Sequence, residues 1–238
     1  MLDHGKDALN LSILGPAGSG KGTLGLALQR QWGAHIFDTG KELRKIGEED
    51  TPLGKMIRGL IDGGNMSPPD LPIEILAERI RLQGYGETWI WDGIPRNLEQ
   101  VEVYREYVDK GRVPLLDGLV VLEAPRSVLV QRLLKRRICS DCDAIFNLDS
   151  APPAHPDVCS PGCGAPLVSR ADDIPQAIAR RIELYEKRTA PAIPMLESMG
   201  VPVLYPDAGR SPDEVLAETM RGIEARLPRG HTRSSRNR

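Results

Sequence analysis

A glycine-rich turn near the N-terminus has the residue types and spacing of a phosphate-binding loop. GPAGSGKGT (residues 15–23) follows an apolar run and fits the pattern of a glycine, four residues, a second glycine and a lysine. Glycines let successive backbone N–H groups point inward, and the N-terminus of a following helix adds partial positive charge. We therefore expect a bound ATP, with its phosphates held by Gly15, Gly18, Ser19, Gly20, Lys21, Gly22 and Thr23.

The hydroxyl residue that usually follows the lysine of such a loop stands one position later here. Gly22 follows Lys21, and Thr23 comes next. Thr23 is therefore the candidate for a place near a metal ion, and its alternative role is that of a residue that begins a helix.

Four cysteines form two closely spaced pairs that could hold a metal ion. Cys139 and Cys142 are separated by two residues, and Cys159 and Cys163 by three. Two thiolate pairs make a closed tetrahedral Zn²⁺ site, whose role is structural. The segment is short, rich in proline and poor in large apolar residues, so metal binding would supply much of its folding free energy. Because the second pair is one residue longer than usual, a disulfide or unbound thiols remain alternatives to zinc.

Arginines in several segments suit the binding of phosphate groups. A planar guanidinium binds phosphate through two parallel hydrogen bonds. Transfer of a phosphoryl group between two phosphates depends on charge neutralisation and alignment more than on a base, and no Ser–His or Cys–His pair is apparent. Arg132 and Arg136 are four residues apart, which predicts that they share one face of a helix. Such a face serves either a phosphate site or a solvated basic surface.

Four motifs in this order resemble those of the adenylate kinases, in the long form with a zinc-bearing lid. They are GPAGSGKGT, DTGKELR (38–44), DGIPRNLEQ (92–100) and the cysteine segment that ends in SRADD (169–173). The resemblance covers roughly residues 9 to 220. That family transfers the γ-phosphoryl group of Mg-ATP to AMP and gives two ADP. The resemblance thus implies ATP and AMP as small-molecule substrates, Mg²⁺ with ATP and structural Zn²⁺ in the lid.

The resemblance also implies a role for individual residues. Arg44 and Arg96 would hold the phosphate of AMP, while Thr39 and Gln100 would read its adenine. Arg132 would contact the adenine of ATP. The residues implied to bind AMP are Thr39, Gly40, Arg44, Ser67, Gly93, Arg96 and Gln100. The residues implied to act in catalysis are Lys21, Arg96, Arg136, Arg170 and Arg181, with Arg180 as the alternative to its neighbour.

Asp92 ends an apolar run at the predicted carboxyl edge of a sheet. At that edge it could steady Mg²⁺ through water, and its alternative role is that of a turn-forming residue before Gly93.

The chain departs from the family pattern at several of these positions. The family's STGDMLR is DTGKELR here, so that Asp38 and Lys41 replace a serine and an aspartate. Ile94 replaces a phenylalanine, and GGNMSPPD (63–70) only loosely resembles the corresponding family segment.

Short apolar runs alternate with helical stretches along the chain, which predicts an α/β P-loop three-layer fold with a central five-stranded parallel sheet. The runs cover residues 8–15, 34–40, 88–93, 118–124 and 201–207, and the best helical stretches cover 68–84 and 98–111. Two regions interrupt the alternation. We expect a core at 1–40, 71–137 and 174–227, a helical NMP-binding lobe at 41–70, a lid at 138–173 and a disordered basic tail at 228–238.

The composition of the chain argues against a nucleic-acid-binding protein and against a membrane protein. The formal net charge is −2 and aromatic residues are 4%, which disfavours a nucleic-acid surface. The first ten residues contain no apolar segment and no run of eighteen apolar residues occurs, so we expect a cytoplasmic protein with no membrane contact. We also predict a monomer.

Two other functions remain open. One is a kinase that acts on UMP or CMP, which Thr39, Gln100 and the long lid argue against. The other is a zinc-ribbon protein that binds nucleic acid and retains the phosphate loop. The spread of the arginines away from the cysteines argues against that second function.

Overall fold

The computed structural model describes residues 8–227 except 64, 143, 156 and 160–162. The basic tail at 228–238 lies outside this part of the chain, and its disorder stays a prediction. The extra residue expected in the second cysteine pair also lies outside it.

A five-stranded parallel sheet forms the centre of the molecule, with the strand order β2-β3-β1-β4-β8. This confirms the predicted architecture. The strands are β1 (Asn10–Leu14), β2 (His35–Asp38), β3 (Trp89–Asp92), β4 (Gly118–Val121) and β8 (Val203–Leu204). Each lies within one of the predicted apolar runs. Because helices cover both faces, side chains on both sides of a strand are buried, which explains continuous rather than alternating hydrophobicity.

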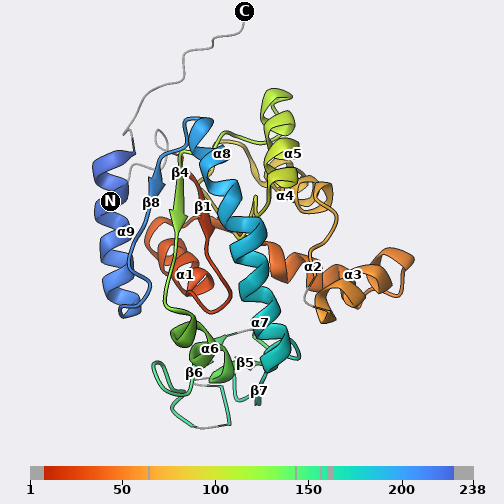
Figure 1. The fold of residues 1–238 in the computed structure, drawn as a ribbon, viewed down its shortest axis with the longest axis vertical. Helices are drawn as coiled ribbons and strands as arrows, with labels where there is room; N and C mark the ends of the chain where they lie inside the picture. The colour runs from red at the N-terminus through yellow and green to blue at the C-terminus, as the bar shows by residue number, and fades with distance from the viewer. Residues whose placement is uncertain (1–7, 64, 143, 156, 160–162, 228–238) are drawn as a thin grey trace, which may run out of the picture.

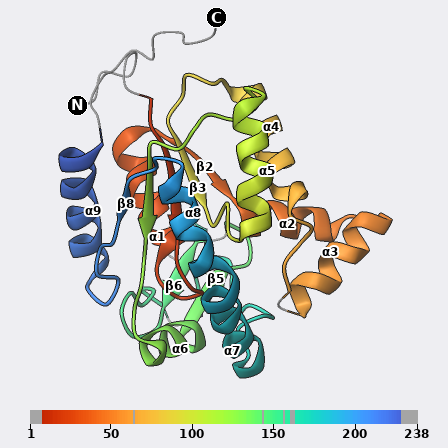
Figure 2. The same ribbon diagram turned by 45° about the horizontal axis from the view of Figure 1, so that its top comes forward.

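Helices pack on both faces of this sheet (Figures 1 and 2). Ile13 and Ile90 point to one face and pack with α1 and α9, while Trp89 and Trp91 point to the other and pack with α4, α5 and α8. The bounds are α1 (Lys21–Trp32), α4 (Asp70–Gln83), α5 (Leu98–Asp109), α8 (Ile193–Ser198) and α9 (Pro212–Arg226).

Two excursions leave this body at the carboxyl side of the sheet. The first is a helix pair, α2 (Thr39–Glu48) and α3 (Pro52–Asp62), which projects from one side of the molecule in Figure 1. The side chain of Thr51 caps α3, and Pro52 occupies its first turn, where a missing N–H costs nothing.

The second excursion holds the cysteines in a small antiparallel sheet ordered β6-β5-β7. Its strands are β5 (Arg136–Cys139), β6 (Ile145–Asn147) and β7 (Leu167–Val168), and it lies beyond α6 (Arg126–Leu134) in Figure 1. The chain then returns through α7 (Pro175–Leu184), the π-helix η1 (Tyr185–Thr189) and the short 3₁₀-helix η2 (Ala190–Ala192).

The prediction that Arg132 and Arg136 share a helix face is wrong. Helix α6 ends at Leu134, and Arg136 begins strand β5, where it pairs with Asn147. Pairing with a segment eleven residues away overrides the local helical pattern, because strand partners outweigh intrinsic propensity at a helix end.

Among the described residues, no helix is both long and apolar enough to cross a membrane.

Candidate active site

One cavity of about 690 Å³ lies at the carboxyl end of the sheet, between the two excursions. The residues predicted at the ATP side that line it are Gly15, Gly18, Ser19, Gly20, Lys21, Gly22, Thr23, Asp92, Arg132, Arg136, Arg170 and Arg181. Those predicted at the AMP side that line it are Thr39, Gly40, Arg44, Ser67, Gly93, Arg96 and Gln100. The fold therefore brings together residues that are spread over most of the sequence.

The phosphate loop joins β1 to α1 through glycines in conformations that other residues avoid. Gly15, Gly18 and Gly20 have φ angles of 151°, 83° and 96°. A Cβ atom on Gly15 would stand 2.4 Å from the backbone oxygen of Leu122, so a side chain cannot be placed there without moving backbone. Ser19 Oγ is buried and has no hydrogen-bond partner among the described residues, as expected of a group that awaits a ligand.

Lys21 folds back onto the loop that precedes it. Its Nζ donates to the backbone oxygens of Gly15, at 2.8 Å, and Pro16, at 2.9 Å. Burial lowers the pKa of Lys21 to about 8, and the nearby carboxylate of Asp92 opposes this shift. A phosphate chain in the loop would offer the ammonium group a stronger, charged partner.

Asp92 ends β3 directly above the start of α1. Its Oδ2 lies 3.6 Å from the position that a Cβ on Gly22 would occupy. Burial raises the pKa of Asp92 to about 6, while Lys21 acts in the opposite direction. A carboxylate, together with the hydroxyl of Thr23 on the same cavity wall, is a donor set that suits Mg²⁺.

On the acceptor side, the turn after β3 fixes the orientation of Arg96 and Gln100. Arg96 Nε donates to the backbone oxygen of Gly93 at 2.7 Å, and the Arg96 backbone N–H donates to Gln100 Oε1 at 2.8 Å. The Gln100 amide therefore has its oxygen engaged, and its N–H groups remain the donors that it can offer to a base. Thr39 Oγ1 donates to the backbone oxygen of Asp92 at 2.9 Å, which ties α2 to β3.

Three arginines enter the cavity from the lid and from α7. Arg136 forms two hydrogen bonds with Asp173, of 2.6 and 2.7 Å. Arg181 contacts the same carboxylate at 3.2 Å and Asp172 at 2.9 Å. Burial, together with repulsion from Arg136 and Arg44, lowers the pKa of Arg170 to about 10, so the group stays charged at neutral pH.

Arg180, the alternative to Arg181, takes a different direction. Its Nη2 donates to Asn65 Oδ1 in the segment that follows α3, and Arg180 does not line the cavity. The geometry thus favours Arg181 as the cavity residue.

The sequence prediction missed a loop that forms the far wall beside Arg132. Arg132 Nη1 donates to the backbone oxygen of Ala208 at 2.8 Å, and residues 208–212 line the cavity. Ser211 and Glu214 form a capping box that predicts the start of α9, but no local pattern indicates that this loop meets a helix end 76 residues earlier.

Apolar walls were missed as well. They come from the inner side of α3, from β6 and from η1, a π-helix of a kind often found at functional sites. The residues of these walls are Ile57, Leu60, Ile61, Ile145, Phe146 and Tyr185. Thr189 of η1, which is polar, also lines the cavity.

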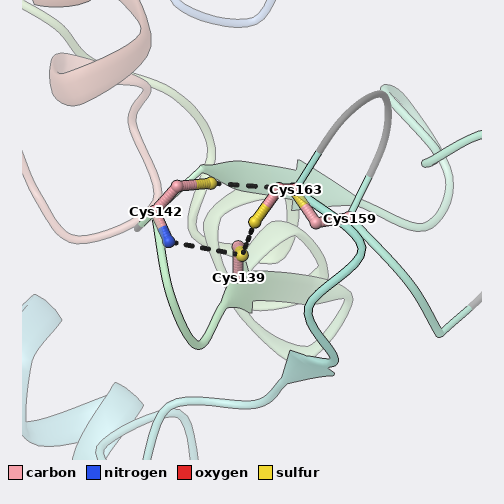
Figure 3. Close-up of side chains that lie close together, drawn as sticks. All are labelled: Cys139, Cys142, Cys159 and Cys163. Carbon is pink, nitrogen blue, oxygen red and sulfur yellow. Dashed lines mark hydrogen bonds between the residues drawn. The ribbon is translucent and has the colours of Figure 1, made fainter.

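The side chains of the four cysteines converge in the excursion that holds β5, β6 and β7 (Figure 3). Their Sγ atoms all lie within 4.8 Å of one another, with 3.5 Å between Cys139 and Cys163 and 3.6 Å between Cys142 and Cys159. Sulfur atoms around a tetrahedral Zn²⁺ are about 3.8 Å apart, which follows from a Zn–S distance of about 2.3 Å. The backbone N–H groups of Asp141 and Cys142 donate to Cys139 Sγ and lower the pKa of that thiol to about 7. The cluster is therefore compatible with zinc.

Comparison with known proteins gives a consistent result. The family model described as Adenylate kinase matches residues 13–201. An adenylate kinase of Thermotoga petrophila is 34% identical over 89% of this chain and 95% of its own length. The adenylate kinase of Carboxydothermus hydrogenoformans is 31% identical over 91% of this chain and 100% of its own length. That of Caldanaerobacter subterraneus is 29% identical over 90% of this chain and 96% of its own length. The chain belongs to the adenylate kinase family.

Proposed function

We propose that the protein catalyses the reversible transfer of the γ-phosphoryl group of ATP to AMP, which gives two molecules of ADP. The observation that carries this proposal is the convergence of a phosphate loop, a carboxylate and arginines from both excursions on one cavity. Such an arrangement suits phosphoryl transfer, because that reaction needs alignment and charge neutralisation more than covalent chemistry.

ATP would bind on the phosphate-loop side. Backbone N–H groups of residues 15–23 and the ammonium of Lys21 would hold its β- and γ-phosphates, and Ser19 Oγ would gain a partner. Asp92, through water, and Thr23 would hold Mg²⁺, which supplies positive charge between the phosphates when it is bound. The adenine would lie between Arg132 and the loop at 208–212.

AMP would bind on the opposite side, against α2 and the turn after β3. Arg44 and Arg96 would hold its phosphate, with Gly40 and Gly93 leaving room for the guanidinium groups. Gln100 would donate an N–H to N1 of the adenine, which is an acceptor, whereas N3 of uracil carries a hydrogen and would oppose it. An oxygen of the AMP phosphate is already ionised, so it can attack without a general base.

The remaining arginines would act on the phosphoryl group in transit. Arg136 and Arg181 share Asp173, which holds both guanidinium groups at the cavity before a substrate arrives. Arg170 would come from the lid. Closing of a lid at 138–173 and of an NMP-binding lobe at 41–70 over a core would exclude water and so suppress hydrolysis of ATP.

The four cysteines would hold Zn²⁺ in a structural role. Their site is closed and lies in the lid away from the phosphate loop, so that it stabilises the lid rather than the reaction. We further propose that the enzyme is a cytoplasmic monomer.

An assay that couples ADP formation to a detectable signal tests the function. ATP plus AMP should give two ADP per event, and ATP with AMP omitted should give little, because water is a poor substitute for the acceptor. Higher activity with UMP or CMP than with AMP would instead support a pyrimidine nucleotide kinase. Salt-sensitive binding of oligonucleotides without any ADP formation would support the nucleic-acid alternative.

A further inference from the structure

A negatively charged residue stands inside the acceptor part of the cavity, where the resemblance leads one to expect serine. Asp38 ends β2, and in the sheet it is the register partner of Asp92 at the end of β3. Both residues line the cavity. The carboxyl ends of parallel strands meet at one edge, so the two residues stand at neighbouring positions on that edge of the sheet.

Asp38 lies close to one of the arginines that the AMP phosphate would contact. Its Oδ1 lies 3.3 Å from the point where a Cβ on Gly40 would stand, and Arg44 Nη1 lies 3.0 Å from the same point. The Oδ1 atom also accepts a hydrogen bond of 2.8 Å from the backbone N–H of Lys41, and thereby caps α2. No salt bridge of 4.0 Å or less joins Asp38 to another residue in the described part of the chain.

The charge of Asp38 acts on charged groups of three neighbouring segments. Burial raises the pKa of Asp92 on β3 and lowers those of Arg96 in the following turn and of Arg170 from the lid, and the Asp38 carboxylate adds to the first shift and opposes the other two. Lys21 at the start of α1 faces the same space through Asp92. The carboxylate therefore contributes to the electric field that an incoming phosphate meets.

We propose that Asp38 lowers the affinity of the acceptor site for phosphate groups, because its charge weakens the binding of phosphate to Arg44, Arg96 and Arg170. This inference rests on the proposed function. A phosphate group alone is then held poorly, because the carboxylate repels it. A nucleoside monophosphate is retained, because contacts with its base add to the weakened contact with its phosphate. The site thus binds both inorganic phosphate and AMP less tightly than it would without this charge, and releases its phosphorylated product readily.

The variant Asp38→Asn separates the charge from the helix cap. The amide oxygen of asparagine accepts the Lys41 N–H as well as a carboxylate does, while the negative charge is removed. At neutral pH and low ionic strength, we expect the dissociation constant of AMP, measured by calorimetry, to fall about 3- to 10-fold. Inhibition by inorganic phosphate in competition with AMP should strengthen at least as much, and the KM for ATP should change less than the constants for AMP.

Two further variants complete the experiment. Asp38→Ser restores the residue that the family usually has, also caps α2, and should shift the constants in the same direction. Asp109→Asn removes an exposed carboxylate at the end of α5, outside the cavity, and should leave them unchanged.

The inference is overturned if both Asp38 variants bind AMP and inorganic phosphate as the wild type does, or more weakly. That result leaves the proposed function intact, since wild-type protein would still form ADP from ATP and AMP. Failure of the wild type to form ADP would instead contradict the proposed function.

Discussion

At the scale of single residues, we predict that Lys21 supplies positive charge to the phosphates of ATP. The variant Lys21→Ala removes a charge that no neighbouring residue of the loop supplies, and its side chain contacts the loop through backbone oxygens alone. We expect kcat to fall about 10²- to 10³-fold. Thermal unfolding should change little. Lys110→Ala, at the exposed end of α5, serves as the control, and unchanged kcat in Lys21→Ala would contradict the assignment.

Two residues with shifted pKa values predict how activity depends on pH. Asp92 must be ionised and Lys21 must be protonated for each to act on Mg-ATP, and their pKa values are about 6 and about 8. Because kcat/KM reports on the free enzyme, it should fall as pH drops through about 6 and again as pH rises through about 8. In Asp92→Asn the acidic limb should disappear from what activity remains. A profile that is flat across this range would refute the two roles.

Gly93 leaves the space in which the Arg96 guanidinium lies. A Cβ at Gly93 would stand 2.7 Å from Arg96 Nη2, and its φ is 79°. Gly93→Ala should raise the KM for AMP while the KM for ATP stays constant. Gly111→Ala is the matched control, since Gly111 has a φ of 66° and open space around its Cβ position. Both variants introduce a backbone strain of about 1–2 kcal/mol, but only Gly93→Ala should change the KM for AMP. Equal kinetics in the two would argue against a role of Arg96 in the acceptor site.

At the scale of the elements, we predict that zinc bound by the four cysteines decides whether the lid folds. The lid has short strands, and its few apolar side chains, such as Ile145 and Val168, are partly exposed. After chelation of the metal, hydrogen exchange should accelerate in β5, β6 and β7 while the central sheet remains protected. Freshly purified protein should contain zinc by atomic emission, and its absence there would contradict the site. Cys142→Ser should lose lid protection without any chelator.

The helices and strands also show which parts of the fold and of the site could be predicted from the sequence alone. Buried parallel strands are apolar on both faces, and β1, β3 and β4 were therefore predictable from their composition. The phosphate loop and the cysteine pairs were predictable because their residues are close together in sequence. Arg136 in β5 and the loop at 208–212 were not predictable in this way, because distant partners determine their structure: β6 for the first and Arg132 for the second.

A motif predicts the structure and role of a segment better than it predicts the effect of a single substitution within that segment. By resemblance, DTGKELR predicted that Arg44 contributes to a nucleotide site, and Arg44 lines the cavity. The significance of Asp38 within it could not be read from the letters, since it depends on Asp92 and Arg170, which lie far away in the chain.

At the scale of the whole molecule, adjacent arginines on α7 reach in opposite directions. Arg181 contacts Asp172 and Asp173 at the root of the lid, while Arg180 donates to Asn65 beyond α3. A helix moves as one rigid rod, so a rotation that suits one contact also alters the other. We therefore predict that α7 couples the cysteine-bearing excursion to the segment that follows α3, so that a substrate bound beside one favours binding of a substrate beside the other.

We expect the two substrates to bind cooperatively as a result. A non-hydrolysable ATP analogue should increase the affinity for AMP by about 5-fold in calorimetry. In Asn65→Ala the gain should shrink, and Lys187→Ala, an exposed residue of the following π-helix, should preserve it. Independent affinities in the wild type would mean that α7 does not couple the ATP and AMP sites.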